Sequence, residues 1–355
     1  MTTTLRSANV IGLGLIGGSI ALALKQRGWA VHGDDSRPQT LADALDRGVV
    51  DASGLDPDAE ITFVAVPVLA IVEQVKRALV ETTGMVTDVG SVKTPVCRSN
   101  ADRRFIGGHP MSGSELDGLD GAQADLFNGG VWVLTPLEDS DDRTFAQLNG
   151  IIAGFGADVV ALTPERHDQL VAVVSHVPHL TAATLMSMAN DRAEEHAALL
   201  RLAAGGFRDM TRVASGQPGI WIDICSENRA AITGALDDLI AGLSDMRDVI
   251  STDDHDGLHA RLQSAREARS NLPTRVVHPE DLAEVRIPIP DRPGAAAEVF
   301  TLAAELSVNI ANFEVVHVAE SNRGVAVMLI DQSKAEIFRG GLIARGFRPA
   351  VQALS

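Results

Sequence analysis

Several classes of protein are excluded by what the chain has little of. Its 355 residues include two cysteines, Cys97 and Cys225, so it cannot carry a disulfide framework, and this usage is typical of a reducing cytoplasm. Its longest apolar run, residues 10–24, contains four glycines and a serine and falls short of the roughly 20 residues of a membrane span. The first residues also lack the apolar stretch of a secretion signal. We therefore expect a cytoplasmic protein that does not insert into a membrane.

Positive charge, and lysine above all, is also scarce. Thirty lysines and arginines against 47 aspartates and glutamates give a formal net charge of −17. Nucleic acids and anionic membranes bind basic surfaces, so neither is an expected partner. A small anionic substrate would be repelled by the chain as a whole, which means that cations must gather at its site. Because the chain has only four lysines, we expect these cations to be mostly arginines.

The order of residue patterns predicts an α/β protein of three domains. Residues 1–162 alternate short β-branched runs with helix-length segments, which predicts a doubly wound, parallel, helix-covered sheet. Residues 163–275 carry apolar residues at helical spacing and no strand pattern, so we expect an all-α domain whose first helix starts at Thr163 and Pro164. Residues 280–355 follow a β-α-β-β-α-β pattern. The apolar content of the helical domain favours a homodimer core.

A glycine motif marks the start of the first domain. Gly12, Gly14 and Gly17 have G-x-G-x-x-G spacing between a predicted strand and a predicted helix. The first glycine permits a tight turn, the second lets the backbone approach a pyrophosphate, and the third lets helix and strand pack closely. The helix N-terminus supplies N–H donors and a partial positive charge to the phosphates. The expected cofactor-binding residues are Gly12, Gly14, Leu15, Ile16, Gly17 and Asp35.

An acidic residue at the end of the second predicted strand favours NAD as the cofactor. Asp35 lies about 20 residues after the glycine motif, where a carboxylate hydrogen-bonds a ribose 2′-hydroxyl and repels a 2′-phosphate. Arg37 follows closely and could serve the 2′-phosphate of NADP instead. A glycine-rich turn without a ligand is the simpler interpretation, but the strand before it and the helix after it favour the dinucleotide.

Candidate catalytic side chains fall in short motifs after predicted strands or in predicted helices. Such strand ends are where doubly wound folds bind ligands. In GGHPMSGSE, residues 107–115, the proline after His109 excludes a continuing helix, so we expect this histidine at the end of a strand. The other candidates, in DVGSVK, ERHD, SHVPH and GGFRDMTR, are Ser91, Lys93, His167, Asp168, Ser175, His176, His179, Arg208 and Arg212.

Taken together, these motifs resemble the prephenate dehydrogenase family, which includes arogenate-using relatives. The glycine motif, DVGSVK, GGHPMSGSE, ERHD, SHVPH and GFRDMTRVA followed by PGIWIDI occur in the family's order over nearly the whole chain. The resemblance implies oxidation of the ring alcohol of a 4-hydroxycyclohexadienyl substrate, with hydride transfer to NAD and loss of the ring carboxylate as carbon dioxide. For prephenate the product is 4-hydroxyphenylpyruvate, the precursor of tyrosine. No metal is needed for this chemistry.

The resemblance also implies roles for individual residues. His109 matches the catalytic histidine, and a neutral imidazole suits a group that takes or polarises the alcohol proton. Arg212 matches the family's substrate arginine, whose planar fork suits a carboxylate. Ser91 is expected to share the alcohol hydrogen bond, and Asp168 to support His179. The expected substrate-binding residues are Arg212, Ser114, Glu115, His179 and Trp221.

Simpler interpretations stay open for several of these residues. Arg212 could form an ion pair with Asp209, three residues before it. His176 and His179 could be half of a metal site or core histidines. Trp221 could be ordinary packing. Lys93 could be a solvated loop charge.

The C-terminal block resembles an ACT domain, a small amino-acid-sensing module. It has DRPG in its first turn and NIANFEV in its second strand. Because the pathway implied by the resemblance ends in an amino acid, we expect feedback inhibition by tyrosine. The expected effector residues are Asp291, Pro293, Gly294 and Asn309. A structural appendage that binds nothing is the alternative.

Two other functions compete with this one. β-Hydroxyacid dehydrogenases also join a dinucleotide domain to helices, but they use a lysine of the helical domain, and residues 163–275 contain none. A non-catalytic sensor of NAD and an amino acid is disfavoured only by the pairing of His109 with Arg212. The choice between prephenate and arogenate stays open, because the two differ in a keto or amino group far from His109.

Overall fold

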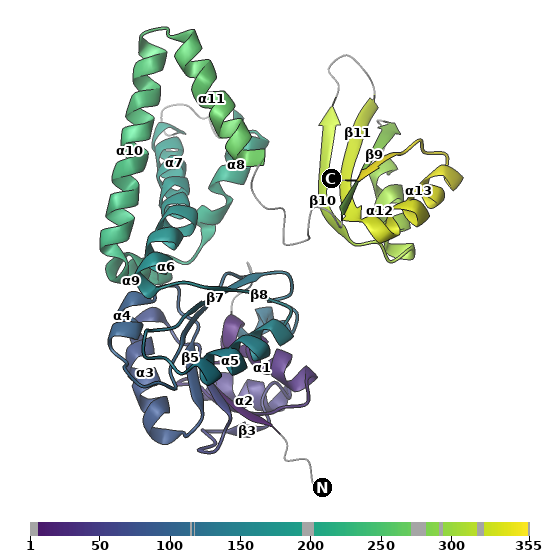
Figure 1. The fold of residues 1–355 in the computed structure, drawn as a ribbon. Helices are drawn as coiled ribbons and strands as arrows, with labels where there is room; N and C mark the ends of the chain where they lie inside the picture. Colours follow the sequence, from purple (N-terminus) through teal and green to yellow (C-terminus); the bar gives the residue numbers. More distant parts are fainter. Residues whose placement is uncertain are drawn as a thin grey trace. The chain divides into compact units, whose positions relative to one another are not determined.

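A computed structural model describes residues 6–113, 116, 118–193, 202–270, 282–290, 294–317 and 323–353. The chain divides into two compact units, Met1–His259 and Ala260–Ser355. The first unit holds an N-terminal α/β domain followed by helices, and the second holds a small α/β domain (Figure 1).

The N-terminal domain is built on a parallel sheet with strand order β3-β2-β1-β4-β5. Every residue of β4 and β5 is buried, as expected for parallel strands covered on both faces. The strand order reverses between β1 and β4, which is where such sheets form a ligand crevice at their carboxyl ends. The strands and intervening helices are β1 Ser7–Ile11, α1 Leu15–Gln26, β2 Ala30–Asp34, α2 Pro38–Asp46, β3 Ala52–Ser53, β4 Ile61–Val64, α3 Val68–Glu81, β5 Met85–Asp88 and α4 Thr94–Arg98.

The last three strands of this domain correct the expectation of an entirely parallel sheet. β6 (Gly107–Pro110), β7 (Val131–Thr135) and β8 (Asp158–Ala161) form a separate sheet in which β6 runs antiparallel to β7. A parallel pair needs a long crossover, usually a helix. Between β6 and β7 the described chain has only turns and the short helix η1 (Gly118–Gly121), whereas α5 (Asp142–Gly154) joins β7 to the parallel β8.

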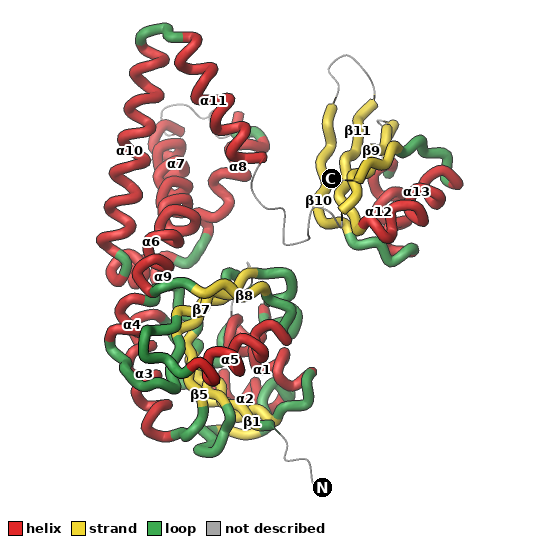
Figure 2. Tube along the Cα trace, viewed as in Figure 1, coloured by secondary structure: helices red, strands yellow, loops and turns green. Residues whose placement is uncertain are grey.

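Helices make up the rest of the first unit (Figure 2). Thr163 caps the first of them by accepting a hydrogen bond from the Arg166 N–H at 3.3 Å, and Pro164 is its first residue. The expected helix start at Thr163 and Pro164 is therefore confirmed. The helices are α6 Pro164–Val171, the π-helical turn η2 Ala172–His176, α7 Val177–Ala193, α8 Gly205–Thr211, the 3₁₀ turn η4 Arg212–Ser215, α9 Pro218–Glu227 and α10 Arg229–Ser251. Helix α11, His255–Ser270, begins in the first unit and continues into the second.

The run Pro164–Arg192 is the one helix of the described chain that is long and apolar enough to cross a membrane by length and composition. Only 33% of its most apolar window is buried within the chain. It nevertheless carries four buried polar side chains, which contact other parts of the chain, namely those of His167, Asp168, His176 and His179. A helix packed against protein explains this combination better than a membrane span.

The second unit contains the expected β-α-β-β-α-β order. Its antiparallel sheet has the strand order β10-β11-β9-β12, and both helices lie on one face of it (Figure 2). Val285, Ile287, Met328 and Phe338 belong to the core between helices and sheet. The elements are β9 Leu282–Pro290, α12 Ala295–Glu305, β10 Ile310–His317, β11 Arg323–Asp331, η6 Gln332–Lys334, α13 Ala335–Ala344 and β12 Ala350–Ala353.

Candidate active site

The glycine loop after β1 has the shape that a dinucleotide requires. Gly12 has a φ of +90°, and a Cβ there would lie 2.4 Å from the Ala65 carbonyl oxygen. A Cβ on Gly17 would lie 1.8 Å from the Gly12 carbonyl oxygen, so both positions exclude any side chain. A Cβ on Gly14 would meet nothing within 4 Å. Packing therefore does not explain Gly14, and the open space beside it suits a pyrophosphate.

The first turn of α1 also fits an anion. Among the described residues, no side chain hydrogen-bonds to its N-terminal N–H groups, and no acidic residue lies in that turn. Leu15, Ile16 and Gly17 thus present backbone donors at the positive end of the helix dipole, as expected for phosphate binding.

The two carboxylates at the end of β2 have different tasks. Asp35 accepts a hydrogen bond from the Leu13 N–H at 2.8 Å, which holds its carboxylate against the glycine loop. Asp34 instead forms an ion pair with Arg77 of α3 at 2.6 Å. Arg37, the alternative anchor for a 2′-phosphate, lies 3.4 Å from the Asp35 carboxylate. Asp35 is therefore placed beside the loop as a ribose-binding residue would be.

His109 lies in β6, whose backbone packs tightly against the end of β5. A Cβ on Gly108 would lie 2.7 Å from the Asp88 carbonyl oxygen, so the glycine before the histidine permits this close approach. His109 Nδ1 lies 2.8 Å from His167 Nε2, and the two rings meet edge to face at 5.0 Å. The structure thus joins the end of a strand to the first helix of the next domain through two imidazoles.

The carboxylate of Asp168 completes this contact. Its Oδ1 lies 2.8 Å from His167 Nδ1, and its two oxygens accept hydrogen bonds of 2.8 Å from the Lys93 and Thr94 N–H groups. The expectation that Asp168 supports His179 is therefore wrong: the carboxylate supports His167 instead. Both residues are candidates because of the ERHD motif, but nothing in that motif indicates the contact with His109.

Burial keeps the imidazoles of the site uncharged. It lowers the pKa of His109 well below 6.5, and the neighbouring His167, Lys93 and His176 lower it further. Burial likewise lowers the pKa of His176 to about 4. For Asp168 burial raises the pKa, but hydrogen bonds from His167, Thr94 and Lys93 outweigh it, so the pKa stays below its ordinary value. At neutral pH the rings of His109 and His176 are therefore neutral, and Asp168 is a carboxylate.

Lys93 is a structural cation rather than a solvated loop charge, so that interpretation is wrong. Its side chain is fully buried and forms an ion pair with Asp88, which is also fully buried. The Asp88 carboxylate accepts further hydrogen bonds from the Gly90 N–H at 2.8 Å and the Gly108 N–H at 3.3 Å. This pair fixes the loop between β5 and α4, in which Ser91 is half-buried. Asp88 was not singled out from the sequence.

A second aromatic cluster lies farther along the helical domain. The His179 ring stacks on Trp221 with centroids 3.5 Å apart, and His176 meets the same indole edge-on at 6.1 Å. The Asn228 amide donates to the Asp168 carbonyl oxygen at 2.8 Å and lies 3.3 Å from His176 Nδ1. Among the described residues, no group of three or more histidine, cysteine, aspartate or glutamate side chains is arranged to hold a metal.

Where the structure describes the remaining predicted residues, it gives their position in the fold. Arg212 is exposed in the first position of η4, which packs against α7. In the C-terminal domain, Gly294 has a φ of +88° at the start of α12, and Asn309 is exposed just before β10. Four further predicted positions lie outside the described residues, namely Ser114, Glu115, Asp291 and Pro293.

Comparisons with known proteins agree with this geometry. Residues 20–166 match the nucleotide-binding domain of prephenate dehydrogenase, and residues 163–264 match its dimerization domain. A prephenate dehydrogenase from Bacillus subtilis is 33% identical over 332 residues, covering 88% of this chain and 89% of the relative. A crystal structure of Synechocystis arogenate dehydrogenase, 33% identical, superposes with a TM-score of 0.66 over 75% of this chain and 99% of that one.

A second solved structure extends the comparison to a ligand complex. Prephenate dehydrogenase from A. aeolicus, in complex with hydroxyphenyl propionate and NAD+, is 26% identical and superposes with a TM-score of 0.71. The match covers 77% of this chain and 100% of that one. The domain order, the glycine loop and the matched lengths lead to one conclusion: the chain belongs to the prephenate dehydrogenase family of NAD-dependent oxidoreductases.

Proposed function

We propose that this chain oxidises prephenate with NAD and that His109 accepts the proton of the ring alcohol. The observation that carries the proposal is the neutral, half-buried imidazole of His109, which lies in the domain that carries the glycine loop and is held by His167 and Asp168 of the helical domain. A general base must be unprotonated at the working pH, and burial ensures this here. The ring carboxylate leaves as carbon dioxide because its loss makes the ring aromatic.

The cofactor half of the proposal rests on the residues around β1. The backbone donors at the start of α1 would hold the pyrophosphate, and Asp35 would hold a ribose hydroxyl. NAD, when bound, accepts the hydride. The chain itself then has to orient the alcohol, take its proton and hold the substrate's carboxylates.

We assign these binding tasks to residues of the motifs that both domains carry. Ser91 lies in the loop fixed by Lys93 and is proposed to share the alcohol hydrogen bond. Arg212 is proposed to bind a substrate carboxylate, since the residue is exposed and the planar fork of an arginine suits a carboxylate. The stacked pair of His179 and Trp221 is proposed as a wall of the ring pocket. Ser114 and Glu115 keep their proposed roles as further pocket residues.

One assay tests both the reaction and the substrate. The purified protein is mixed with NAD and prephenate, with arogenate in a parallel cuvette, and the absorbance of reduced nicotinamide is followed. We expect a rise with prephenate. A rise with arogenate alone would preserve the mechanism and change the substrate, an alternative supported by the match to Synechocystis arogenate dehydrogenase.

A variant separates the enzyme from a non-catalytic sensor of NAD and an amino acid. His109→Asn should lower kcat by about 100- to 10,000-fold, because the base is lost, while leaving NAD affinity nearly unchanged. No turnover by the wild-type protein with either substrate, or turnover that survives in the variant, would overturn the proposed role of His109.

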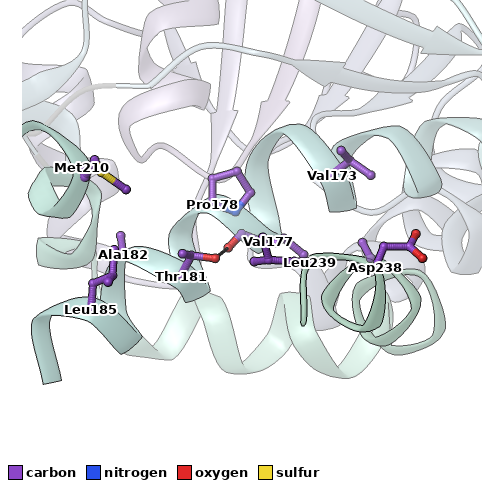
Figure 3. Close-up of a pocket in the computed structure, with 10 residues that line it drawn as sticks. Val173, Val177, Pro178, Thr181, Ala182, Leu185, Met210, Asp238 and Leu239 are labelled. Atoms are coloured by element: carbon purple, nitrogen blue, oxygen red, sulfur yellow. Dashed lines mark hydrogen bonds between the residues drawn. The ribbon is translucent and has the colours of Figure 1, made fainter. Parts of the chain in front are cut away.

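We also propose that the helical domain forms a homodimer. It contains an apolar pocket of about 590 Å³ with side chains from three helices, among them Val177 and Leu185 of α7, Met210 of α8 and Leu239 of α10 (Figure 3). Beside it, Val174 is 65% exposed. A second copy would cover such a surface, and the matched family domain is a dimerization domain. Sedimentation should give a mass of about twice 37.5 kDa, the mass of one chain. Val174→Glu should shift the measured mass toward that of a single chain.

The C-terminal domain is proposed to be an ACT-type sensor of tyrosine. Its support is the β-α-β-β-α-β order and the left-handed Gly294 at the start of α12. Gly294 and Asn309 would contribute to the effector site, with Asp291 and Pro293. Titration of tyrosine should lower the initial rate and release heat; a titration with neither effect would leave the domain as a structural appendage.

A cytoplasmic location is proposed on the state of the thiols. Cys97 and Cys225 are both free, and burial raises the pKa of Cys97 to about 11. Burial also raises the pKa of Cys225. Protonated thiols that form no bridge suit a reducing compartment.

A further inference from the structure

We propose that His167 and Asp168 are positioning residues that fix the tautomer of His109 and take up the positive charge when His109 accepts a proton. The inference rests on the proposed role of His109 as the base and adds the residues that make it one. It is carried by two contacts, His109 Nδ1 to His167 Nε2 and His167 Nδ1 to Asp168 Oδ1, each 2.8 Å long.

The hydrogen-bond partners determine where each proton lies. A carboxylate can only accept, so the contact with Asp168 requires a proton on His167 Nδ1. A neutral His167 then has a lone pair on Nε2, and the contact with His109 requires a proton on His109 Nδ1. His109 Nε2 is left with its lone pair, which makes it the nitrogen that can accept the alcohol proton.

Asp168 is itself held so that it cannot turn away. The Lys93 and Thr94 N–H groups donate to its two oxygens at 2.8 Å, and its own carbonyl oxygen accepts from Asn228. These donors come from the loop after β5 and from the N-terminus of α4 and of α10. The two domains therefore set the direction of the carboxylate together, and through it the orientation of both rings.

The same chain gives the accepted proton a charge partner. When the alcohol proton binds His109 Nε2, the proton on His109 Nδ1 can move to His167 Nε2 along their shared hydrogen bond. His167 then carries the positive charge and keeps its Nδ1 proton, which stays bonded to the Asp168 carboxylate. No proton is lost, and Asp168 remains ionised. A buried cation is strongly disfavoured without such an anion.

Kinetics of the full-length chain as a function of pH test this inference. Asp168→Asn should lower kcat with prephenate at least about 100-fold, because His167 is no longer held in one tautomer. Removing a negative charge so close to the two rings should also move the acid limb of kcat/KM to lower pH by about one to three units. Among the described residues, the charged or titratable groups facing His109 are His167, Lys93 with its partner Asp88, and His176, and the substitution leaves them all in place.

Two further variants guard against a purely structural effect. His167→Gln keeps a hydrogen-bond acceptor for His109 but cannot take a proton, so it should show a similar loss of kcat. If Asp168→Asn does not fold, the kcat of His167→Gln tests the inference in its place. The double variant should lose no more than the worse single variant, because residues acting in series are not additive. NAD affinity and the melting temperature are measured for each.

A matched control removes a carboxylate of similar local function elsewhere. Asp141 accepts from the Thr144 N–H at 2.9 Å at the start of α5, as Asp168 accepts from Thr94 at the start of α4. Asp141→Asn should leave the pH profile unchanged. If Asp168→Asn also keeps the wild-type acid limb, or if the single losses multiply in the double variant, the inference is wrong, while activity of the wild type and its loss in His109→Asn would still support the proposed function.

Discussion

The proposed cofactor half and the proposed catalytic half of the site are built from different parts of the polypeptide. The cofactor half consists of the backbone of Gly12–Gly17 with the carboxylate of Asp35, all within two adjacent strands and one helix. The catalytic half consists of the side chains of His109, His167 and Asp168, and its first contact joins residues 58 positions apart. The first is held by covalent continuity, whereas the second exists only while two domains pack together.

The catalytic half also has to bury polar groups, and it does so in two ways. Lys93 and Asp88 are buried as charges, and the carboxylate is satisfied by the lysine and by two backbone N–H groups. The histidines are buried as neutral rings whose pKa values burial has lowered. The ion pair of Lys93 and Asp88 makes the loop rigid, but removing either partner should cost the chain much of its stability. The neutral rings remain able to take a proton, which catalysis needs.

The largest predicted effect is the loss of stability when the buried cation, Lys93, is removed. Lys93→Met keeps the apolar stem but leaves the Asp88 charge buried without its partner. Removing one member of a buried pair costs about 3–5 kcal/mol. Urea unfolding followed by tryptophan fluorescence measures it, because Trp29 and Trp132 both lie in the core of the N-terminal domain.

A surface pair in the same domain provides the control. Lys25 lies 2.6 Å from Asp51, with the two side chains 28% and 44% exposed. Lys25→Met should cost no more than about 1 kcal/mol, because solvent screens such pairs. Equal losses in Lys93→Met and Lys25→Met would show that burial of the Lys93 pair does not stabilise the loop.

The cofactor half could be predicted from the sequence because its determinants are local. The spacing of Gly12, Gly14 and Gly17, the strand before them and Asp35 after the next strand all lie within about 25 residues of one another. The helix start at Thr163 and Pro164 is local in the same sense, and it is confirmed. The order of elements in the C-terminal domain followed from hydrophobic periodicity alone.

The catalytic half could be predicted only in part. The residues His109, His167 and Asp168 were recognised, but their mutual contacts depend on how α6 packs on the loop after β5. No local pattern distinguishes a solvated lysine from Lys93, which is buried by tertiary structure. The antiparallel β6 was predicted wrongly, although the chain between Pro110 and Val131 offers the signal: its described residues form turns and no helix of crossover length.

Alanine at two glycines sharpens the contrast between packing and ligand binding within the cofactor half. Gly17→Ala would drive a methyl group into the Gly12 carbonyl oxygen, so α1 must shift, at a cost of about 2 kcal/mol or more in urea unfolding. Gly14→Ala meets only open space and should change stability by less than about 0.5 kcal/mol. It should instead weaken NAD binding about tenfold or more in calorimetric titration, a change of about 1.4 kcal/mol. If both variants lose stability and neither loses NAD affinity, the space beside Gly14 is not a phosphate site.

The smallest predicted effect is a change in how steeply the free energy of unfolding depends on pH when His176 is replaced. Burial lowers the pKa of His176 to about 4 in the folded chain, against 6.5 for an ordinary histidine. Between these values the unfolded chain binds more protons, so this residue's contribution to stability is complete above pH 6.5 and is lost as the pH falls toward 4. His176→Gln can still pair with Asn228 but cannot titrate, so the free energy of unfolding should depend less steeply on pH in this window. The difference in slope should be at most about 1.4 kcal/mol per pH unit. A His176→Gln slope equal to that of the wild type would mean that His176 is not buried as a neutral ring.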